Sequence, residues 1–151
     1  MYSRILVPID GSAPAQAGLE EAIRIGAATK AKLVVLNVVN EFPILKDPVA
    51  HAYYDDLLRA LAQAGKDMLA RAAQEAAAAG VDCETHVVDA STSRSSDVIV
   101  EEIARRGCDL VVMGTHGRRG LKRLTLGSDA ELVVRHAAVP VLLVKGRAPA
   151  A

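Results

Sequence analysis

The sequence predicts an α/β protein with a single domain, in which helices cover both faces of an open sheet of five parallel strands. Short apolar runs alternate with helical segments along the whole chain, as they do in doubly wound sheets. The run Lys32–Val39 contains almost no polar residue, which is typical of a parallel strand covered on both faces. Other apolar runs stop abruptly at glycine or aspartate, and such residues favour loops at strand ends. Together these observations indicate a Rossmann-like architecture.

The first strand is expected at Arg4–Ile9, because this apolar run is broken by Asp10-Gly11-Ser12. Pro14 then suits the first turn of a helix, where the N–H group that proline lacks is not needed. We expect this helix to reach about Lys30, and the strand at Lys32–Val39 to follow it.

The middle of the chain predicts a loop and then a long helix. Asn40–Tyr54 contains two prolines and mixed polar residues, so we expect a long loop without regular structure. In Asp55–Ala79 apolar residues recur at steps of three and four, which is typical of an amphipathic helix. This helix is expected to end at Gly80.

The second half of the chain continues the alternation. Ser95 or Ser96 is expected to cap a helix that Gly107 ends. Pro140 lies near the start of the last strand, where a missing hydrogen-bond donor does least harm. The expected elements are a weaker strand at Val81–Val88, the helix to about Arg106, a strand at Leu110–Met113, a helix at about Asp129–His136 and a strand at Val139–Val144.

Length and charge limit the classes of function. A chain of 151 residues fits one domain, expected at residues 1–146 with a loose tail at 147–151. Lysine plus arginine number 18, as do aspartate plus glutamate, so the basic surplus of a nucleic-acid-binding protein is missing. No apolar run reaches membrane-spanning length. The first residues also lack the charged, apolar and small-residue regions of a signal peptide. We therefore expect a cytoplasmic protein with no nucleic-acid or membrane partner.

The two cysteines, Cys83 and Cys108, have neither CxxC spacing nor paired histidines nearby, so a metal site is not expected. They are interpreted as reduced thiols that fill small apolar spaces, with a redox role as the alternative.

The segment Gly114-Thr115-His116-Gly117 carries the strongest functional signal. It follows an apolar run, and Gly127-Ser128 comes after nine further residues. Glycines let backbone N–H groups approach an anion. Ser128 can act as the N-cap of the next helix with Glu131 completing a capping box, so that a positive helix end points back at the same loop. The pattern predicts a phosphate-binding site, although Gly114 and Gly117 alone could form an ordinary strand-to-helix turn.

The position of this loop in the fold supports the same hypothesis. Ligands of open parallel sheets bind at the carboxyl ends of the strands, where the strand order reverses. If the first and fourth strands are neighbours there, Asp10 and Gly114–Gly117 share one crevice.

Other nucleotide-binding motifs are missing from the sequence. The spacing GxxxxGK[ST] of a P-loop starts at neither Gly114 nor Gly117. The first turn has Asp10-Gly11-Ser12 in place of the GxGxxG of dinucleotide enzymes or the Ser-Gly-Gly of ATP pyrophosphatases.

These residues give the chain a resemblance to the universal stress protein family, from Ile5–Ser12 to Val139–Val144. A nucleotide-binding subgroup of that family is marked by Gly-x2-Gly-x9-Gly-(Ser/Thr). The chain fits it without a gap at Gly114, Gly117, Gly127 and Ser128. The resemblance implies a fold similar to that of adenine nucleotide hydrolases, and ATP as ligand, with or without Mg²⁺.

The resemblance also implies a role for each matching position. Asp10 would meet the ribose, with Pro8 and Ile9 beside the nucleoside. The backbone of Val38 would face adenine, and Met113 would pack at the floor. The phosphates would be held by Gly114, Gly117, Gly127 and Ser128, with Arg118 near them.

Two departures from the family pattern stand out. Asp89–Ser96 replaces the usual Gly-x-Pro turn after the third strand, so the turn must differ there. Asn37 replaces a common histidine, which changes a hydrogen bond near the base. Neither departure touches a phosphate-binding glycine.

Several residues keep a second interpretation. Asp10 could instead bond its own turn, as Asx residues do. Ser128 can serve as a cap and as a phosphate ligand in different ligand states. His116 has no evident partner carboxylate and is assigned a structural role. Two groups of residues also remain open. The basic cluster is either a phosphate clamp or a solvated face; it consists of Arg118, Arg119, Lys122 and Arg123. The loop residues His51, Tyr53 and Tyr54 could cover a base or shield the sheet edge.

Three functional hypotheses follow. The first is an ATP-binding module without a catalytic residue, in which nucleotide orders the long loop and alters binding to an unknown regulatory partner during stress. The second is a slow ATPase, for which Arg118 and a magnesium ion could supply part of the charge clamp. The third is a nucleotide-independent dimeric adaptor. The family habit implies a homodimer through Val141–Val144, a strand expected at a sheet edge.

Overall fold

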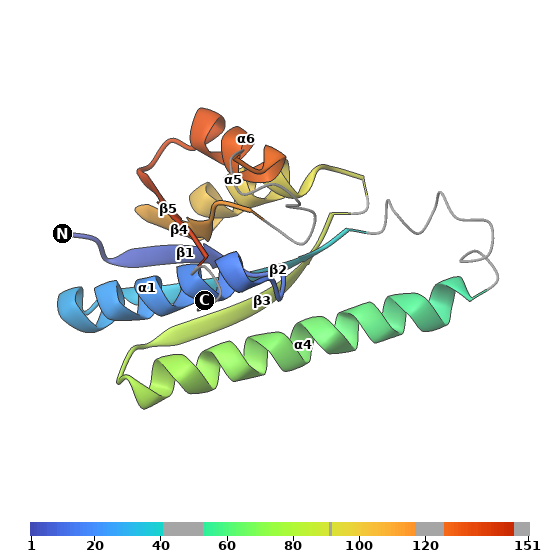
Figure 1. The fold of residues 1–151 in the computed structure, drawn as a ribbon, viewed down its shortest axis with the longest axis horizontal. Helices are drawn as coiled ribbons and strands as arrows, with labels where there is room; N and C mark the ends of the chain where they lie inside the picture. The colour runs from blue at the N-terminus through green and yellow to red at the C-terminus, as the bar shows by residue number, and fades with distance from the viewer. Residues whose placement is uncertain (41–52, 91, 117–125, 147–151) are drawn as a thin grey trace, which may run out of the picture.

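A computed structural model describes residues 1–40, 53–90, 92–116 and 126–146, and it has the predicted architecture. In these described ranges five parallel strands form one sheet in the order β3-β2-β1-β4-β5, and four helices flank it (Figure 1). The elements are β1 (Arg4–Pro8), α1 (Ala13–Thr29), β2 (Lys32–Val39), α4 (Tyr54–Ala78), β3 (Cys83–Asp89), α5 (Ser95–Arg105), β4 (Leu110–Gly114), α6 (Ser128–His136) and β5 (Val141–Val144).

The first and fourth strands are neighbours, as the prediction of a shared crevice required. Ile5 pairs with Leu110 and Leu6 with Val111, while the other edge of β1 pairs with β2. The strand order therefore reverses between β1 and β4, and the carboxyl ends of these two strands flank the switch point.

Two core clusters lie on opposite faces of the sheet because side chains alternate along each strand. Ile5 and Val7 of β1 pack with α1 and α4, whereas Leu6 packs with α5 and α6. In Figure 1 the two helix pairs lie on either side of the sheet. Cys108 is buried in the α5–α6 cluster and Cys83 packs against the other, which confirms that both thiols fill apolar space.

Pro14 lies in the first turn of α1, as predicted. The structure adds that Ser12 is the N-cap of this helix, since its hydroxyl accepts a hydrogen bond from the N–H of Ala15 at 3.3 Å. The helix ends at Thr29, and Lys30 has a left-handed φ of 63°. Gly80, after α4, has a φ of 70° that a side chain would strain.

Two predicted helix caps are wrong. The N-cap of α5 is Arg94, so Ser95 and Ser96 are already inside the helix. The hydroxyl of Ser96 is buried and has no hydrogen-bond partner among the described residues. The N-cap of α6 is Gly127, and Ser128 is its first helical residue. The capping box of Ser128 with Glu131 therefore does not form, because the N–H of Glu131 bonds to the carbonyl of Gly127.

The last strand begins one residue after Pro140 rather than at Val139. Proline cannot donate to a neighbouring strand, but its carbonyl accepts a hydrogen bond from the N–H of Val111 at 3.0 Å. Pro140 thus aligns β5 with β4 without belonging to the strand.

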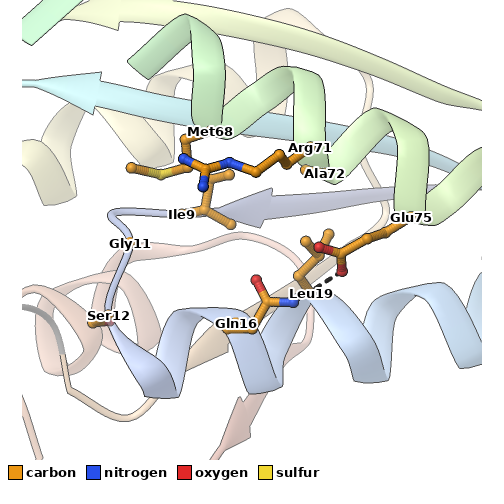
Figure 2. Close-up of a pocket in the computed structure, with 9 residues that line it drawn as sticks. All are labelled: Ile9, Gly11, Ser12, Gln16, Leu19, Met68, Arg71, Ala72 and Glu75. Atoms are coloured by element: carbon orange, nitrogen blue, oxygen red, sulfur yellow. Dashed lines mark hydrogen bonds between the residues drawn. The ribbon is translucent and has the colours of Figure 1, made fainter. Parts of the chain in front are cut away.

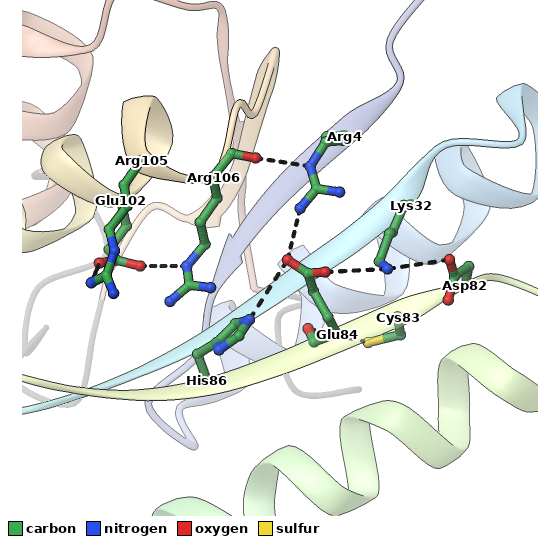
Figure 3. Close-up of polar contacts among 9 residues, drawn as sticks. All are labelled: Arg4, Lys32, Asp82, Cys83, Glu84, His86, Glu102, Arg105 and Arg106. Atoms are coloured by element: carbon green, nitrogen blue, oxygen red, sulfur yellow. Dashed lines mark hydrogen bonds and ion pairs between the residues drawn. The ribbon is translucent and has the colours of Figure 1, made fainter.

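Charged residues surround the amino ends of the first three strands (Figure 3). Glu84 pairs with Arg4 at 2.7 Å and with Lys32 at 3.2 Å. Partial burial favours the neutral acid, but the bonds from Lys32 and Arg4 outweigh it and hold the pKa of Glu84 below its ordinary value of 4.5. A separate pair on α5 joins Arg106 to the buried Glu102. These contacts lie at the end of the sheet where the strands begin, whereas the switch point lies at their carboxyl ends.

The described helices include none with the length and continuous apolar sequence that crossing a bilayer requires.

Candidate functional site

The turn after β1 holds Asp10 in a fixed conformation. An oxygen of the Asp10 carboxylate accepts a hydrogen bond from the N–H of Ser12 at 2.9 Å, so Asp10 does bond its own turn as an Asx residue. Gly11 has a φ of 81°, which favours glycine in such a turn. The Asp10 side chain is half-buried. A carboxylate has about four acceptor sites, so Asp10 can accept hydrogen bonds besides the one from Ser12.

The residues expected around the base divide between the two faces of the sheet. Val38 and Met113 belong to the α5–α6 cluster, and Pro8 shares the face of Leu6 by strand alternation. The side chain of Ile9 lies in the opposite cluster, under α1 and α4. Its backbone stays at the carboxyl edge, where its N–H bonds to the carbonyl of Leu36 at 2.8 Å. Pro8, Val38 and Met113 thus share one face, and Ile9 can contribute only backbone there.

Thr115 brings the end of β4 and the start of α6 together. Its N–H bonds to the carbonyl of Val144 at 3.0 Å, and its carbonyl accepts from the N–H of Gly127 at 2.8 Å. Its hydroxyl is 2.8 Å from Nδ1 of His116, so His116 has a structural contact. Gly127 therefore lies beside Thr115, the residue that follows Gly114 at the end of β4. Gly117 and Arg118 lie outside the described residues, as do His51 and the rest of the basic cluster.

The N-terminus of α6 has the properties of an anion site. Ser128 is exposed, and the first-turn N–H groups of α6 donate no hydrogen bond to a capping side chain of the described residues. In α1, by contrast, the hydroxyl of Ser12 accepts such a bond from the N–H of Ala15. Glu131 pairs with Arg135 at 2.8 Å. Phosphate oxygens would satisfy the free donors of α6 and would lie at the positive end of its dipole.

Gly114 has a packing role besides any ligand role. A Cβ at this position would lie 2.5 Å from the carbonyl carbon of Pro14 and 2.8 Å from the backbone N of Ala15. Gly18 faces the same strand, with a Cβ position 3.2 Å from the N of Gly114. The first turns of α1 thus rest directly on the end of β4, and glycine is required there by close approach of two backbones.

The sequence analysis did not foresee how Asn37 and Gly65 join β2 to α4. Asn37 is buried, and its side-chain amide donates to the carbonyl of Ile9 at 3.0 Å. A Cβ on Gly65 would lie under 3.0 Å from Oδ1 of Asn37 and 3.3 Å from its Cγ. Asn37 is therefore a positioning residue for the Ile9–Asp10 turn. Two features of the sequence could have indicated this contact: Asn37 is a polar residue in an apolar strand, and Gly65 is a glycine inside a helix.

A cavity of about 270 Å³ lies between α1 and α4, on the face of the sheet opposite Val38 and Met113 (Figure 2). Ile9 and the turn residues Gly11 and Ser12 form one wall. Gln16 of α1 and Glu75 of α4 meet across it, with an amide-to-carboxylate bond of 2.9 Å. The sequence analysis did not identify this cavity, because no local pattern relates residues so far apart in the chain.

The described residues contain no group of three or more His, Cys, Asp or Glu side chains that could hold a metal ion.

Comparisons with known proteins agree with the fold. Residues 1–145 match the model of the universal stress protein family. Universal stress protein MJ0531 of Methanocaldococcus jannaschii is 32% identical over 145 residues, which cover 96% of this chain and 83% of that protein. The solved structure of hypothetical protein MJ0577 superposes with a TM-score of 0.84 at 26% identity, covering 98% of this chain and 99% of that one. A universal stress protein solved in complex with cAMP has a TM-score of 0.68 at 26% identity, covering 97% and 98%.

Proposed function

The chain belongs to the universal stress protein family, and from this premise we propose that it binds an adenine nucleotide, ATP, at the carboxyl ends of β1, β2 and β4. The observation that carries the proposal is the hydrogen bond between Thr115, after Gly114, and Gly127. It places the N-terminus of α6, which no side chain of the described residues caps, at the strand order reversal. The cAMP complex of a related structure supports an adenine nucleotide as ligand.

Each part of the nucleotide has a matching group. Pro8, Val38 and Met113 offer an apolar surface for the base. Asp10 is assigned to the ribose, because its carboxylate can accept a hydrogen bond from a ribose hydroxyl besides the one from the N–H of Ser12. The phosphates are assigned to Gly114, Gly117, Arg118, Gly127 and Ser128.

We assign the protein a binding role rather than a catalytic one. Phosphoryl transfer requires a positioned water and a charge clamp on the transferred group. The described residues at the site offer Asp10, Thr115 and His116, of which each has a structural contact. The protein then acts as a nucleotide-dependent module in a stress response, and slow ATP hydrolysis is the competing activity.

A second copy of the chain is the proposed partner at the sheet edge. Strand β5 pairs only with β4 within the described sheet, and Leu142 is 38% exposed on it. Val134 of the neighbouring α6 is 46% exposed. An apolar strand edge of this kind favours pairing between copies. A nucleotide-independent dimeric adaptor would use the same surface.

Calorimetric titration tests the proposal. ATP with Mg²⁺ is added to protein stripped of bound nucleotide, and released phosphate is then assayed in the same sample. Gly117→Val is expected to abolish binding and leave the dimer intact, because a bulky side chain would obstruct the loop. Failure of the stripped wild-type protein to bind ATP, ADP, AMP or cAMP would leave the dimeric adaptor as the better account.

A matched pair of serines isolates the role of α6. Ser128 and Ser95 are each the first residue of a helix whose N-terminus lacks a side-chain cap. Ser128→Ala is expected to weaken ATP binding about tenfold through loss of one hydrogen bond to a charged group. Ser95→Ala should leave affinity unchanged, so equal effects of the two would contradict the assignment.

A further inference from the structure

The cavity between α1 and α4 has an apolar floor. Leu19 and Ala72 are each 1% exposed, and Ile9 is also buried. Met68 contributes a half-buried, adaptable thioether at one end. Water above such a floor loses hydrogen-bonding partners, so an apolar group is favoured in its place.

The polar groups at the rim divide between the two ends of the cavity. At the Leu19 end, the Glu75 carboxylate is held by the amide of Gln16 at 2.9 Å (Figure 2). At the other end, the guanidinium of Arg71 lies near Met68 and Ile9 in Figure 2. The two charged groups are therefore not paired with each other.

Arg71 keeps most of its hydrogen-bonding capacity. Among the described residues it makes one hydrogen bond, from Nε to the carbonyl of Asp67 in its own helix, at 3.4 Å. Both terminal nitrogens of the guanidinium remain for a ligand, and a guanidinium binds a carboxylate through two parallel hydrogen bonds. The N-terminus of α1 at Ser12 adds positive partial charge to the same wall.

We propose that this cavity is a second ligand site, which binds a small carboxylate with an apolar body. The body lies on Leu19 and Ala72, and the carboxylate is bound by Arg71. The site lies on the opposite face of the sheet from the proposed base site, and the proposal does not depend on nucleotide binding.

The size of the cavity limits the ligand. About 270 Å³ corresponds to roughly nine water molecules at ~30 Å³ each, and falls just below the ~300 Å³ where pockets for drug-sized ligands begin. A ring with a short acid chain fits this volume. An occupant of this size is expected to bind with a Kd of about 1 mM.

The test is an NMR titration of the full chain with 3-phenylpropanoate, its neutral amide and 3-phenylpropylamine. We expect the acid to shift the amide signals of Gly11, Leu19 and Ala72 and to bind at least about fivefold more tightly than the other two probes. Equal binding of acid and amide would overturn the proposal, as would shifts confined to α6 or β5.

Three single variants on α4 test the charge assignment. Arg71→Met keeps the apolar stem and is expected to weaken acid binding about tenfold. Arg59→Met is the matched control, because Arg59 is exposed on the same helix and pairs only with Asp56, at 4.0 Å, among the described residues. Glu75→Gln removes the negative charge from the rim and should tighten binding about twofold. An unchanged affinity in Arg71→Met, or an equal loss in Arg59→Met, would refute the site.

Discussion

The contact between Gly65 and Asn37 allows a quantitative test of how α4 is attached to the sheet. In an exposed helix position, Gly→Ala stabilises by about 1 kcal/mol through helix propensity. At Gly65 the new Cβ would lie under 3.0 Å from Oδ1 of Asn37. Asn37 can move away only by giving up its 3.0 Å hydrogen bond to the carbonyl of Ile9.

The magnitude follows from these opposing effects. Breaking a buried hydrogen bond costs about 1–3 kcal/mol, and overpacking adds about 1–3 kcal/mol. We therefore expect Gly65→Ala to destabilise the protein by about 1–5 kcal/mol after the propensity gain. In a chain that already carries Asn37→Ala, the obstruction is gone, and the same Gly65→Ala should stabilise by about 1 kcal/mol.

Urea unfolding of the wild type, both single variants and the double variant measures this coupling as a double-mutant cycle. Ala64→Gly is the control, because Ala64 is exposed beside Gly65 and reports propensity alone. The reasoning is refuted if Gly65→Ala stabilises the wild-type chain, or if its effect is the same with and without Asn37.

Three further predictions concern packing, charge and thiol reactivity. Gly114→Ala should lower the free energy of unfolding by more than about 2 kcal/mol, because both obstructing groups in α1 are backbone atoms; an unchanged Tm would contradict this. The lowered pKa of Glu84 contributes stability above its ordinary value of 4.5 that is lost as the pH falls through the lowered pKa. Below about pH 4.5, wild type should therefore lose stability more steeply than Glu84→Gln in acid titration of unfolding, and parallel curves would exclude that contribution. Burial raises the pKa of Cys108 to about 11, so a disulfide reagent at neutral pH should modify Cys108 only at the rate of unfolding. The same reagent should modify the half-buried Cys83 before Cys108.

The sheet was predictable because its signal is local. Each buried strand is an apolar run, and Lys32–Val39, whose apolar run contains only Asn37 as a polar residue after Lys32, lies inside the sheet between β3 and β1 as expected. The adjacency of β1 and β4 followed from the general behaviour of such sheets, not from any single residue. Helix ends were less predictable, since adjacent residues compete for the cap. Gly127 takes the position expected for Ser128, one residue away.

The site was predictable only in part, because several of its contacts join residues that are distant in the chain. Strand alternation alone would have placed the side chain of Ile9 on the opposite face from Pro8, and the structure shows Ile9 there. The bond of Asn37 to Ile9 and that of Gln16 to Glu75 have no counterpart in local sequence patterns. Such contacts depend on how whole helices pack against the sheet.

Helix α4 is anchored unevenly, and this sets a gradient of local stability along it. Its fully buried residues begin at Gly65 and continue to Ala76, and its first residue follows Tyr53, which supplies no side-chain cap. The first turns therefore depend mainly on intrinsic helix propensity, and a free helix shorter than about 12–15 residues is marginal in water. Amide hydrogens of residues 54–64 should exchange by local fraying, while those beyond Gly65 wait for a larger opening of the fold. The first turns of α4 can thus unwind while the sheet keeps its core.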